Sequence, residues 1–146
     1  MSLQKPNLKM SKSHQDPRSR ILLTDNPDEI TRKVMSALTD SMNFVSYDPV
    51  SRPGVSNLLQ LLSYFSVNIK SPEELGEIYA GLGLGEFKAL VSQTIADALE
   101  GIRARYAEIM AEDGGRYLDY VEAKGAERAR ASAEATMAIV RDAVGF

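Results

Sequence analysis

Apolar residues recur at helical spacing along most of the chain after residue 26. Spacings of three and four predict helices over about 27–39, 54–66, 86–110 and 116–144, with a shorter helix from residue 72 to about Gly81. No segment alternates apolar and polar residues at period two, so any strand is confined to the first 25 residues. The pattern therefore predicts an all-α fold, a helical bundle preceded by an irregular loop.

Two of these helices begin with a complete capping signature. Asn26 and Ser71 each precede a proline in the first turn, and Glu29 and Glu74 follow the two caps at the third position. The 54–66 helix is apolar around much of its circumference, which predicts that it lies in the middle of the core. Small residues in the middle of the last helix predict close packing against another helix.

Composition excludes several kinds of chemistry. The chain has no cysteine, which rules out disulfides, thiolate metal sites and cysteine nucleophiles. Because the chain has only one histidine, His14, a multi-histidine metal site is impossible. His14 lies among polar residues and is expected to be a solvated loop residue. No apolar run approaches the length of a membrane span.

Charge is distributed unevenly along the chain. Residues 1–20 contain five Lys or Arg residues and one Asp, whereas the whole chain has a formal charge of −3. The first 25 residues also lack a helical period and mix Lys, Ser, Asn and Pro, which predicts a mobile loop and a tether. A basic loop on an acidic body indicates an anionic ligand near the start of the chain, best fitted by a phosphate-bearing small molecule.

Lys9-Met10-Ser11-Lys12-Ser13 is the one segment whose residue types suggest catalysis. Two ammonium groups on a flexible, serine-containing loop are able to follow phosphate charge as it moves, and lysine suits this as a compact charge on a long stem. The same five residues alone would equally describe a basic tail that contacts only water. The surrounding sequence decides between these interpretations.

That sequence resembles the tryptophanyl-tRNA synthetases. The pentapeptide is the phosphate-loop signature of class I aminoacyl-tRNA synthetases, and the likeness extends over nearly the whole chain. It rests on these segments, in this order: Leu23-Thr24-Asp25-Asn26-Pro27, Ser36-Ala37-Leu38-Thr39-Asp40-Ser41, Tyr47-Asp48-Pro49, Arg52-Pro53-Gly54-Val55-Ser56-Asn57-Leu58, Glu86-Phe87-Lys88, Ile102-Arg103-Ala104-Arg105-Tyr106 and Gly125-Ala126-Glu127-Arg128-Ala129. The chain departs from the family at His14-Gln15, where Asp-Pro is usual, and at Gly101, where proline is frequent and a bend is expected.

The resemblance implies a catalytic role for the loop. In this family, ATP activates tryptophan to tryptophanyl-adenylate, pyrophosphate leaves, and the amino acid then passes to tRNA(Trp). Lys9 and Lys12 are the implied catalytic residues, which stabilise charge on the departing pyrophosphate, with Lys12 the first choice. Ser11 and Ser13 complete the implied ATP-phosphate site. We expect Mg²⁺ to arrive with ATP and no metal to be held by the protein itself.

The resemblance also implies a division of the chain. Residues 1–25 would be the phosphate loop and a tether from the catalytic domain, and residues 26–146 would form a C-terminal helical domain of the kind that binds the anticodon. Arg116, Lys124 and Arg128 are the candidate tRNA contacts. Interspersed glutamates make a solvated, salt-bridged face the competing interpretation, and Tyr117 and Tyr120 are expected to pack rather than to stack on bases.

Several alternatives stay open on the sequence alone. The strand-and-helix half that binds adenosine and tryptophan is missing, so the chain by itself is expected to be inactive. Two other functions compete with a tryptophanyl-tRNA synthetase: a tyrosyl-tRNA synthetase and a non-enzymatic helical interaction module. By resemblance, we expect the full-length protein to be a homodimer that does not bind membranes. We expect it in the mitochondrial matrix if its source is eukaryotic, which is the favoured interpretation, or in the cytoplasm if its source is bacterial. Met1-Ser2-Leu3 has the character of an expression start.

Overall fold

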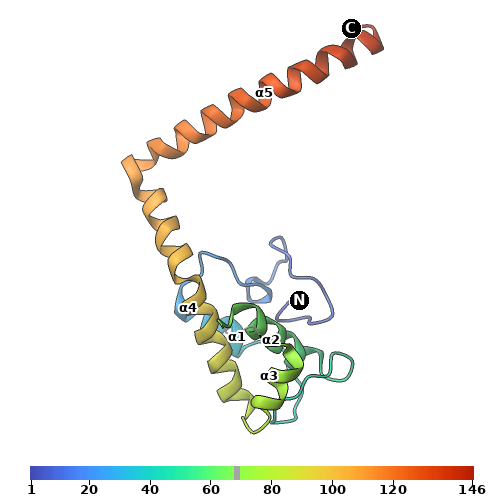
Figure 1. Cartoon of the computed structure of the whole chain (residues 1–146), viewed down its shortest axis with the longest axis vertical. Helices are drawn as coiled ribbons and strands as arrows, with labels where there is room; N and C mark the ends of the chain where they lie inside the picture. The colour runs from blue at the N-terminus through green and yellow to red at the C-terminus, as the bar shows by residue number, and fades with distance from the viewer. Residues whose placement is uncertain (68–69) are drawn as a thin grey trace. The chain divides into compact units, whose positions relative to one another are not determined.

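The computed structural model describes residues 1–67 and 70–146, and within them every regular element is a helix (Figure 1). The elements, in chain order, are the 3₁₀-helix η1 (Pro17–Ser19), α1 (Pro27–Met35), α2 (Pro53–Phe65), α3 (Pro72–Ile78), α4 (Leu84–Ala111), the 3₁₀-helix η2 (Glu112–Gly115) and α5 (Arg116–Val144). The all-α prediction is thus confirmed for the described residues. The chain divides into two compact units, Met1–Arg103 and Ala104–Phe146.

Both predicted capping boxes are present. Asn26 Oδ1 accepts from the Glu29 backbone N–H at 2.9 Å, and the Glu29 carboxylate accepts from the Asn26 N–H at 3.0 Å. Ser71 and Glu74 make the same reciprocal pair at the start of α3. Each box satisfies two backbone donors that a helix start otherwise leaves unpaired. These local bonds explain why both starts were predictable from sequence.

The predicted end of the first helix was wrong by four residues, because distant parts of the chain bind the backbone there. The Lys88 ammonium, buried on α4, donates to the carbonyl oxygens of Met35 at 3.3 Å and Ala37 at 2.8 Å. The Leu38 N–H donates to the Leu3 carbonyl at 2.8 Å. Burial lowers the pKa of Lys88, whose charge these carbonyls and the negative end of α1 stabilise.

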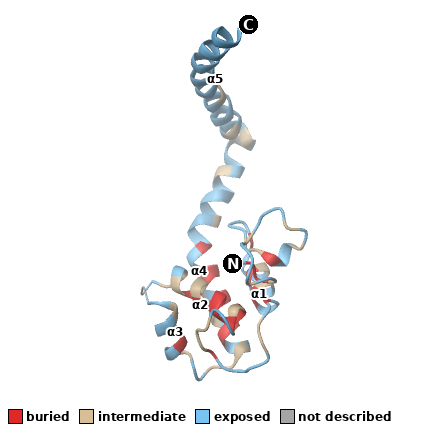
Figure 2. Cartoon of the chain, turned by 90° about the vertical axis from the view of Figure 1, so that its right-hand side faces the viewer, coloured by how far each residue is buried: buried red, intermediate tan, exposed pale blue. Residues whose placement is uncertain are grey.

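The hydrophobic core belongs to the first unit and centres on α2, as predicted. Fully buried side chains come from α1, α2 and the first half of α4, where Figure 2 shows the buried positions gathered. The central members are Ile30, Val34, Val55, Leu58, Leu59, Leu62, Phe87, Val91, Ile95 and Leu99. Leu3, from the irregular first segment, is also part of this core, with 1% of its surface exposed. The first segment is therefore packed against the helices.

Arg52 organises the loop between α1 and α2. Its guanidinium is 3% exposed and donates to Asp40 through two nitrogens, both at 2.9 Å. It also donates to Ser46 Oγ at 2.8 Å and to the carbonyls of Met42 and Phe44, and it lies 4.4 Å from the centre of the Phe44 ring. One buried cation thus satisfies groups along the whole loop, with Asp40 neutralising it.

The Asp40–Arg52 pair makes stability depend on pH. Hydrogen bonds from Arg52 lower the pKa of Asp40 below its ordinary value, so the pair stabilises the fold above the unfolded-state pKa, and that stability is lost as pH falls through the folded-state pKa. We expect Asp40→Asn to lower the free energy of unfolding by about 1–3 kcal/mol at pH 7, and by progressively less at an acid pH below about 3.9, the ordinary pKa of Asp. Urea unfolding at both pH values measures this. Glu100→Gln, an exposed carboxylate on α4, is the control, and an equal loss at both pH values contradicts the prediction.

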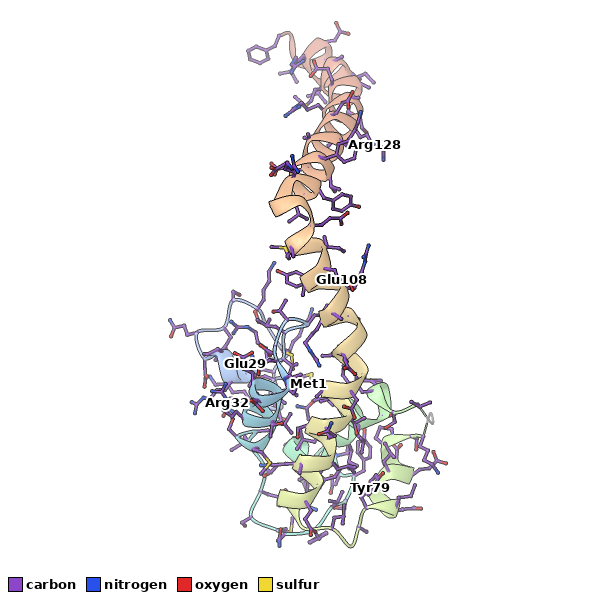
Figure 3. The ribbon with its side chains drawn as sticks, turned by 90° about the vertical axis from the view of Figure 1, so that its left-hand side faces the viewer. Met1, Glu29, Arg32, Tyr79, Glu108 and Arg128 are labelled. Carbon is purple, nitrogen blue, oxygen red and sulfur yellow. The ribbon has the colours of Figure 1, made fainter. Side chains whose placement is uncertain are left out.

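The second unit holds the end of α4, η2 and α5. The bounds of α5 agree with the prediction, and α4 continues through Gly101, where a bend was expected, as a single helix. None of the α5 residues is buried, and its side chains project from every side of the helix (Figure 3). The expected burial of one α5 face is therefore not observed, and Tyr117 and Tyr120, expected to pack, are 43% and 61% exposed.

Candidate functional site

The Lys9–Ser13 pentapeptide forms part of an irregular loop with a turn at Lys12. The His14 N–H donates to the Ser11 carbonyl at 3.3 Å, which closes the turn, and the Ser11 and Ser13 hydroxyls are 3.1 Å apart. Lys9 and Lys12 are both exposed, and no hydrogen bond or ion pair to another described residue holds either ammonium group. The four predicted phosphate-site residues thus lie together, with both cations available to an anionic ligand.

The acidic residue of this segment does not neutralise the lysines. Asp16 accepts from its neighbour Arg18, with Arg18 Nη2 3.0 Å from Asp16 Oδ2, and these bonds lower the pKa of Asp16. Asp16 also caps η1 by accepting from the Arg18 backbone N–H at 2.9 Å. The positive charge of Lys9 and Lys12 is therefore left uncompensated within the loop.

The loop is attached to the helices at points other than the lysines. Met10, in the middle of the pentapeptide, packs against the hydrophobic core. Arg20 Nη1 donates to the His14 carbonyl at 2.8 Å, and His14 Nδ1 accepts from the Asp16 N–H at 3.1 Å. His14 is half-buried rather than fully solvated as expected. The arrangement holds the backbone around the turn and directs the lysines away from the core.

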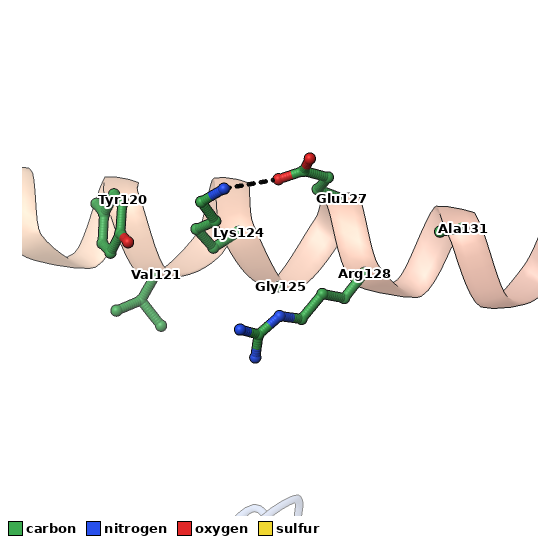
Figure 4. Close-up of a pocket in the computed structure, with 7 residues that line it drawn as sticks. All are labelled: Tyr120, Val121, Lys124, Gly125, Glu127, Arg128 and Ala131. Atoms are coloured by element: carbon green, nitrogen blue, oxygen red, sulfur yellow. Dashed lines mark hydrogen bonds and ion pairs between the residues drawn. The ribbon is translucent and has the colours of Figure 1, made fainter.

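The candidate tRNA contacts lie on α5, apart in sequence from the loop. Arg116, Lys124 and Arg128 are all exposed, and Lys124 pairs with Glu127 at 3.0 Å (Figure 4). The other residues drawn there include Tyr120 and Gly125, and all seven belong to one helix, so they form an open face and not an enclosed cavity. The Lys124–Glu127 pair is the salt bridge expected of a solvated face, whereas no ion pair holds Arg128 within the described part of the chain.

The described residues show neither a metal-ligand cluster nor a membrane-spanning helix. Among the side chains that the structure describes, no three acidic, histidine or cysteine residues gather where they could hold a metal ion. Among the described helices, none combines the length and hydropathy needed to cross a bilayer.

Two residues that support the loop were not identified from sequence. Asn57, on the buried face of α2, hydrogen-bonds to residues 1 and 2, and Arg20 holds the carbonyl of residue 14. A polar residue inside the apolar 54–66 pattern was the available signal for Asn57, because a buried amide requires hydrogen-bond partners. Nothing in the local pattern indicated that those partners lie more than fifty residues away.

Comparison with known proteins places the chain in a family. The profile of the family described as class I tRNA synthetases for tryptophan and tyrosine matches residues 1–100. The tryptophan–tRNA ligases of Bacillus anthracis and Synechocystis are 39% and 41% identical to it over 146 residues, all of this chain but 43% and 42% of those proteins.

A solved structure supports the same placement at the level of the fold. The tryptophanyl-tRNA synthetase of Mycoplasma pneumoniae matches all of this chain with a TM-score of 0.72 at 23% identity, and the match covers 43% of that protein. The chain therefore spans less than half the length of the curated relatives it matches. Because the family profile matches more than half of the chain's residues, the chain belongs to the family of class I tRNA synthetases for tryptophan and tyrosine.

Proposed function

We propose that this chain is the C-terminal part of a tryptophan–tRNA ligase and that it supplies the loop that binds the phosphates of ATP. The observation that carries the proposal is the pair of exposed ammonium groups at Lys9 and Lys12, which have no partner among the described residues and lie on a loop whose backbone is attached to a helical core. Tryptophan–tRNA ligases that match the whole chain support tryptophan over tyrosine as the amino acid.

The proposed reaction assigns the loop an electrostatic role. The carboxylate of tryptophan forms a bond to the α-phosphorus of ATP, the bond from that phosphorus to the bridging oxygen breaks, and pyrophosphate leaves with its charge and Mg²⁺. No proton transfer is needed, so cations that bind the developing charge more tightly than they bind ground-state ATP lower the barrier. Lys12 and Lys9 fill this role, and the Ser11 and Ser13 hydroxyls add donors to phosphate oxygens.

The helical part is the proposed binding surface for tRNA(Trp). Arg116, Lys124 and Arg128 are exposed on α5, and spacings of four and eight place all three near one face of the helix. Lys124 would exchange its Glu127 partner for phosphate, whereas Arg128 needs no such exchange. Arg128 is therefore the stronger contact of these two in the proposal.

Amino-acid-dependent ATP–pyrophosphate exchange by the full-length protein tests this function. We expect exchange with tryptophan, none with tyrosine, and charging of tRNA(Trp) by the same preparation. The 146-residue chain alone should catalyse no exchange, because the loop positions only part of the substrate. Exchange with tyrosine would reassign the protein to the sister enzyme, and no exchange with either amino acid would favour a helical interaction module.

The remaining partners and the location follow from the same resemblance. We propose that the full-length protein is a homodimer and that Mg²⁺ enters bound to ATP. We propose that it acts in the mitochondrial matrix if the source is a eukaryote, or in the cytoplasm if it is a bacterium. Each of these stays a prediction.

A further inference from the structure

Asn57 is a polar side chain buried on the core-facing side of α2. It is 3% exposed, and its neighbours Val55, Leu58 and Leu59 are part of the hydrophobic core. Burying an amide is unfavourable unless both its oxygen and its nitrogen are hydrogen-bonded. The partners of Asn57 therefore show what this residue holds in place.

Within the described part of the chain, the Asn57 side chain makes three hydrogen bonds, and all go to Met1 and Ser2. Nδ2 donates to the carbonyl oxygens of Met1 at 3.2 Å and Ser2 at 3.4 Å, and Oδ1 accepts from the terminal ammonium group of Met1 at 2.9 Å, a position that carries a peptide N–H wherever further residues precede it. The side chain thus acts as donor and acceptor toward one short stretch of backbone. An ionised aspartate or a leucine of similar size would lack the donor or both functions.

That stretch is the stem of the phosphate loop, here defined as residues 1–3 together with residues 19–20. The Leu3 N–H donates to the Ser19 carbonyl at 3.0 Å, which joins the two limbs of the stem. The Leu3 carbonyl accepts from Leu38 at 2.8 Å, and the Leu3 and Ser19 residues are each 1% exposed. The stem is therefore a buried junction between the loop and the helices.

Short paths connect the stem to the two lysines. On the entering limb, the Ser2 N–H donates to the Leu8 carbonyl at 2.8 Å, immediately before Lys9. On the leaving limb, Arg20 Nη1 donates to the carbonyl of His14, which closes the turn that contains Lys12. A displacement of the stem therefore moves both ammonium groups. Displacements of about 1 Å at a catalytic group lower rates by about 100-fold.

We propose that Asn57 is a positioning residue for the phosphate loop: by fixing the stem on α2, it sets where the Lys9 and Lys12 ammonium groups meet the phosphates of ATP. The inference rests on the proposed function. Asn57 touches neither substrate nor the lysines, and it acts through the backbone of residues 1–3. Because the bonds of Asn57 go to the stem of the phosphate loop, we expect its loss to leave tryptophan binding unchanged.

Asn57→Ala in the full-length protein, compared with Ser56→Ala, tests this inference by steady-state ATP–pyrophosphate exchange. Ser56 is a matched control because it is also on α2, is 2% exposed, and bonds the backbone of Asp48 instead of the stem. We expect kcat to fall about 10- to 100-fold in Asn57→Ala with an unchanged KM for tryptophan, and to change less than about 3-fold in Ser56→Ala. An equal fall in both variants would show a general loss of structure and overturn the inference.

Hydrogen exchange of the unmodified protein provides a second measurement that does not depend on a variant folding. The amides of Ser2, Leu3 and Leu38 should exchange as slowly as those in the middle of α2, because all three are bonded at the stem. Exchange as fast as that of the exposed loop would overturn the inference. Normal pyrophosphate exchange in Asn57→Ala overturns this inference alone, whereas no exchange in the unmodified protein overturns the proposed function and this inference with it.

Discussion

Replacing Lys12 with alanine in the full-length protein is expected to lower the kcat of tryptophan-dependent pyrophosphate exchange by about 100- to 1,000-fold. Lys12 lies in the turn of the loop, is exposed, and has no partner among the described residues that could compete with phosphate. In the proposed function, its charge contributes mainly when pyrophosphate leaves. Because that interaction is stronger in the transition state than with bound ATP, the KM for ATP should change much less than kcat.

Lys5→Ala is the matched control for this experiment. Lys5 is an exposed lysine of the same basic segment, outside the pentapeptide, so it shares any general attraction for ATP without the proposed contact. We expect its exchange rate to stay within about 3-fold of the unmodified enzyme and the melting temperature of both variants to be unchanged. Equal losses in the two variants would reduce the role of Lys12 to nonspecific attraction, and full activity in Lys12→Ala would remove it from the mechanism.

The candidate loop could be identified from sequence because the signal lies in residue types at five consecutive positions, and its chemistry stays a prediction. The ammonium and hydroxyl groups of lysine and serine are present whatever conformation the loop adopts. The two capped helix starts were predictable for the same reason, since Asn26 and Glu29 bond within one turn. Hydrogen bonds between residues close in sequence can thus be predicted from short sequence patterns.

The anchors of the loop were not predictable because their partners are remote. Asn57 bonds Met1 across 56 positions, and Lys88 bonds Ala37 across 51. Neither pairing changes the hydrophobic period of its own helix. The early end of α1 follows from the same cause, because Leu3 and Lys88 take backbone groups that a longer helix would use internally.

The apolar pattern of α5 shows a different limit. The spacing of apolar residues predicted an amphipathic helix with the correct bounds. Periodicity identifies which face of a helix is apolar, but it does not identify the surface that covers that face. Every residue of α5 is at least partly exposed within the described chain. Burial in the first unit, by contrast, was predicted well where three helices supply mutually covering faces.

Gly54→Ala is expected to destabilise the first unit by about 2–4 kcal/mol, although alanine favours helix by about 1 kcal/mol over glycine. Gly54 lies in the first turn of α2, where a Cβ atom would be 2.1 Å from the Leu38 carbonyl oxygen and 3.1 Å from Thr39 Cα. Both neighbours are backbone atoms, so rotation of a side chain cannot relieve the clash. The close approach of the two backbone segments therefore requires glycine at position 54.

Gly101→Ala is the matched control, because Gly101 is an α4 residue of the same unit and a Cβ there would meet no atom within 4 Å. We expect it to stabilise by about 0.5–1 kcal/mol, so the two glycine-to-alanine changes should shift the thermal midpoint in opposite directions. Circular dichroism of the two variants measures this directly. Leu38 also donates to Leu3, so relief of the Gly54 clash by movement of residue 38 would displace the loop stem. Gly54→Ala should therefore speed hydrogen exchange at Leu3, and a stable variant with a protected Leu3 amide would contradict the close approach on which the prediction rests.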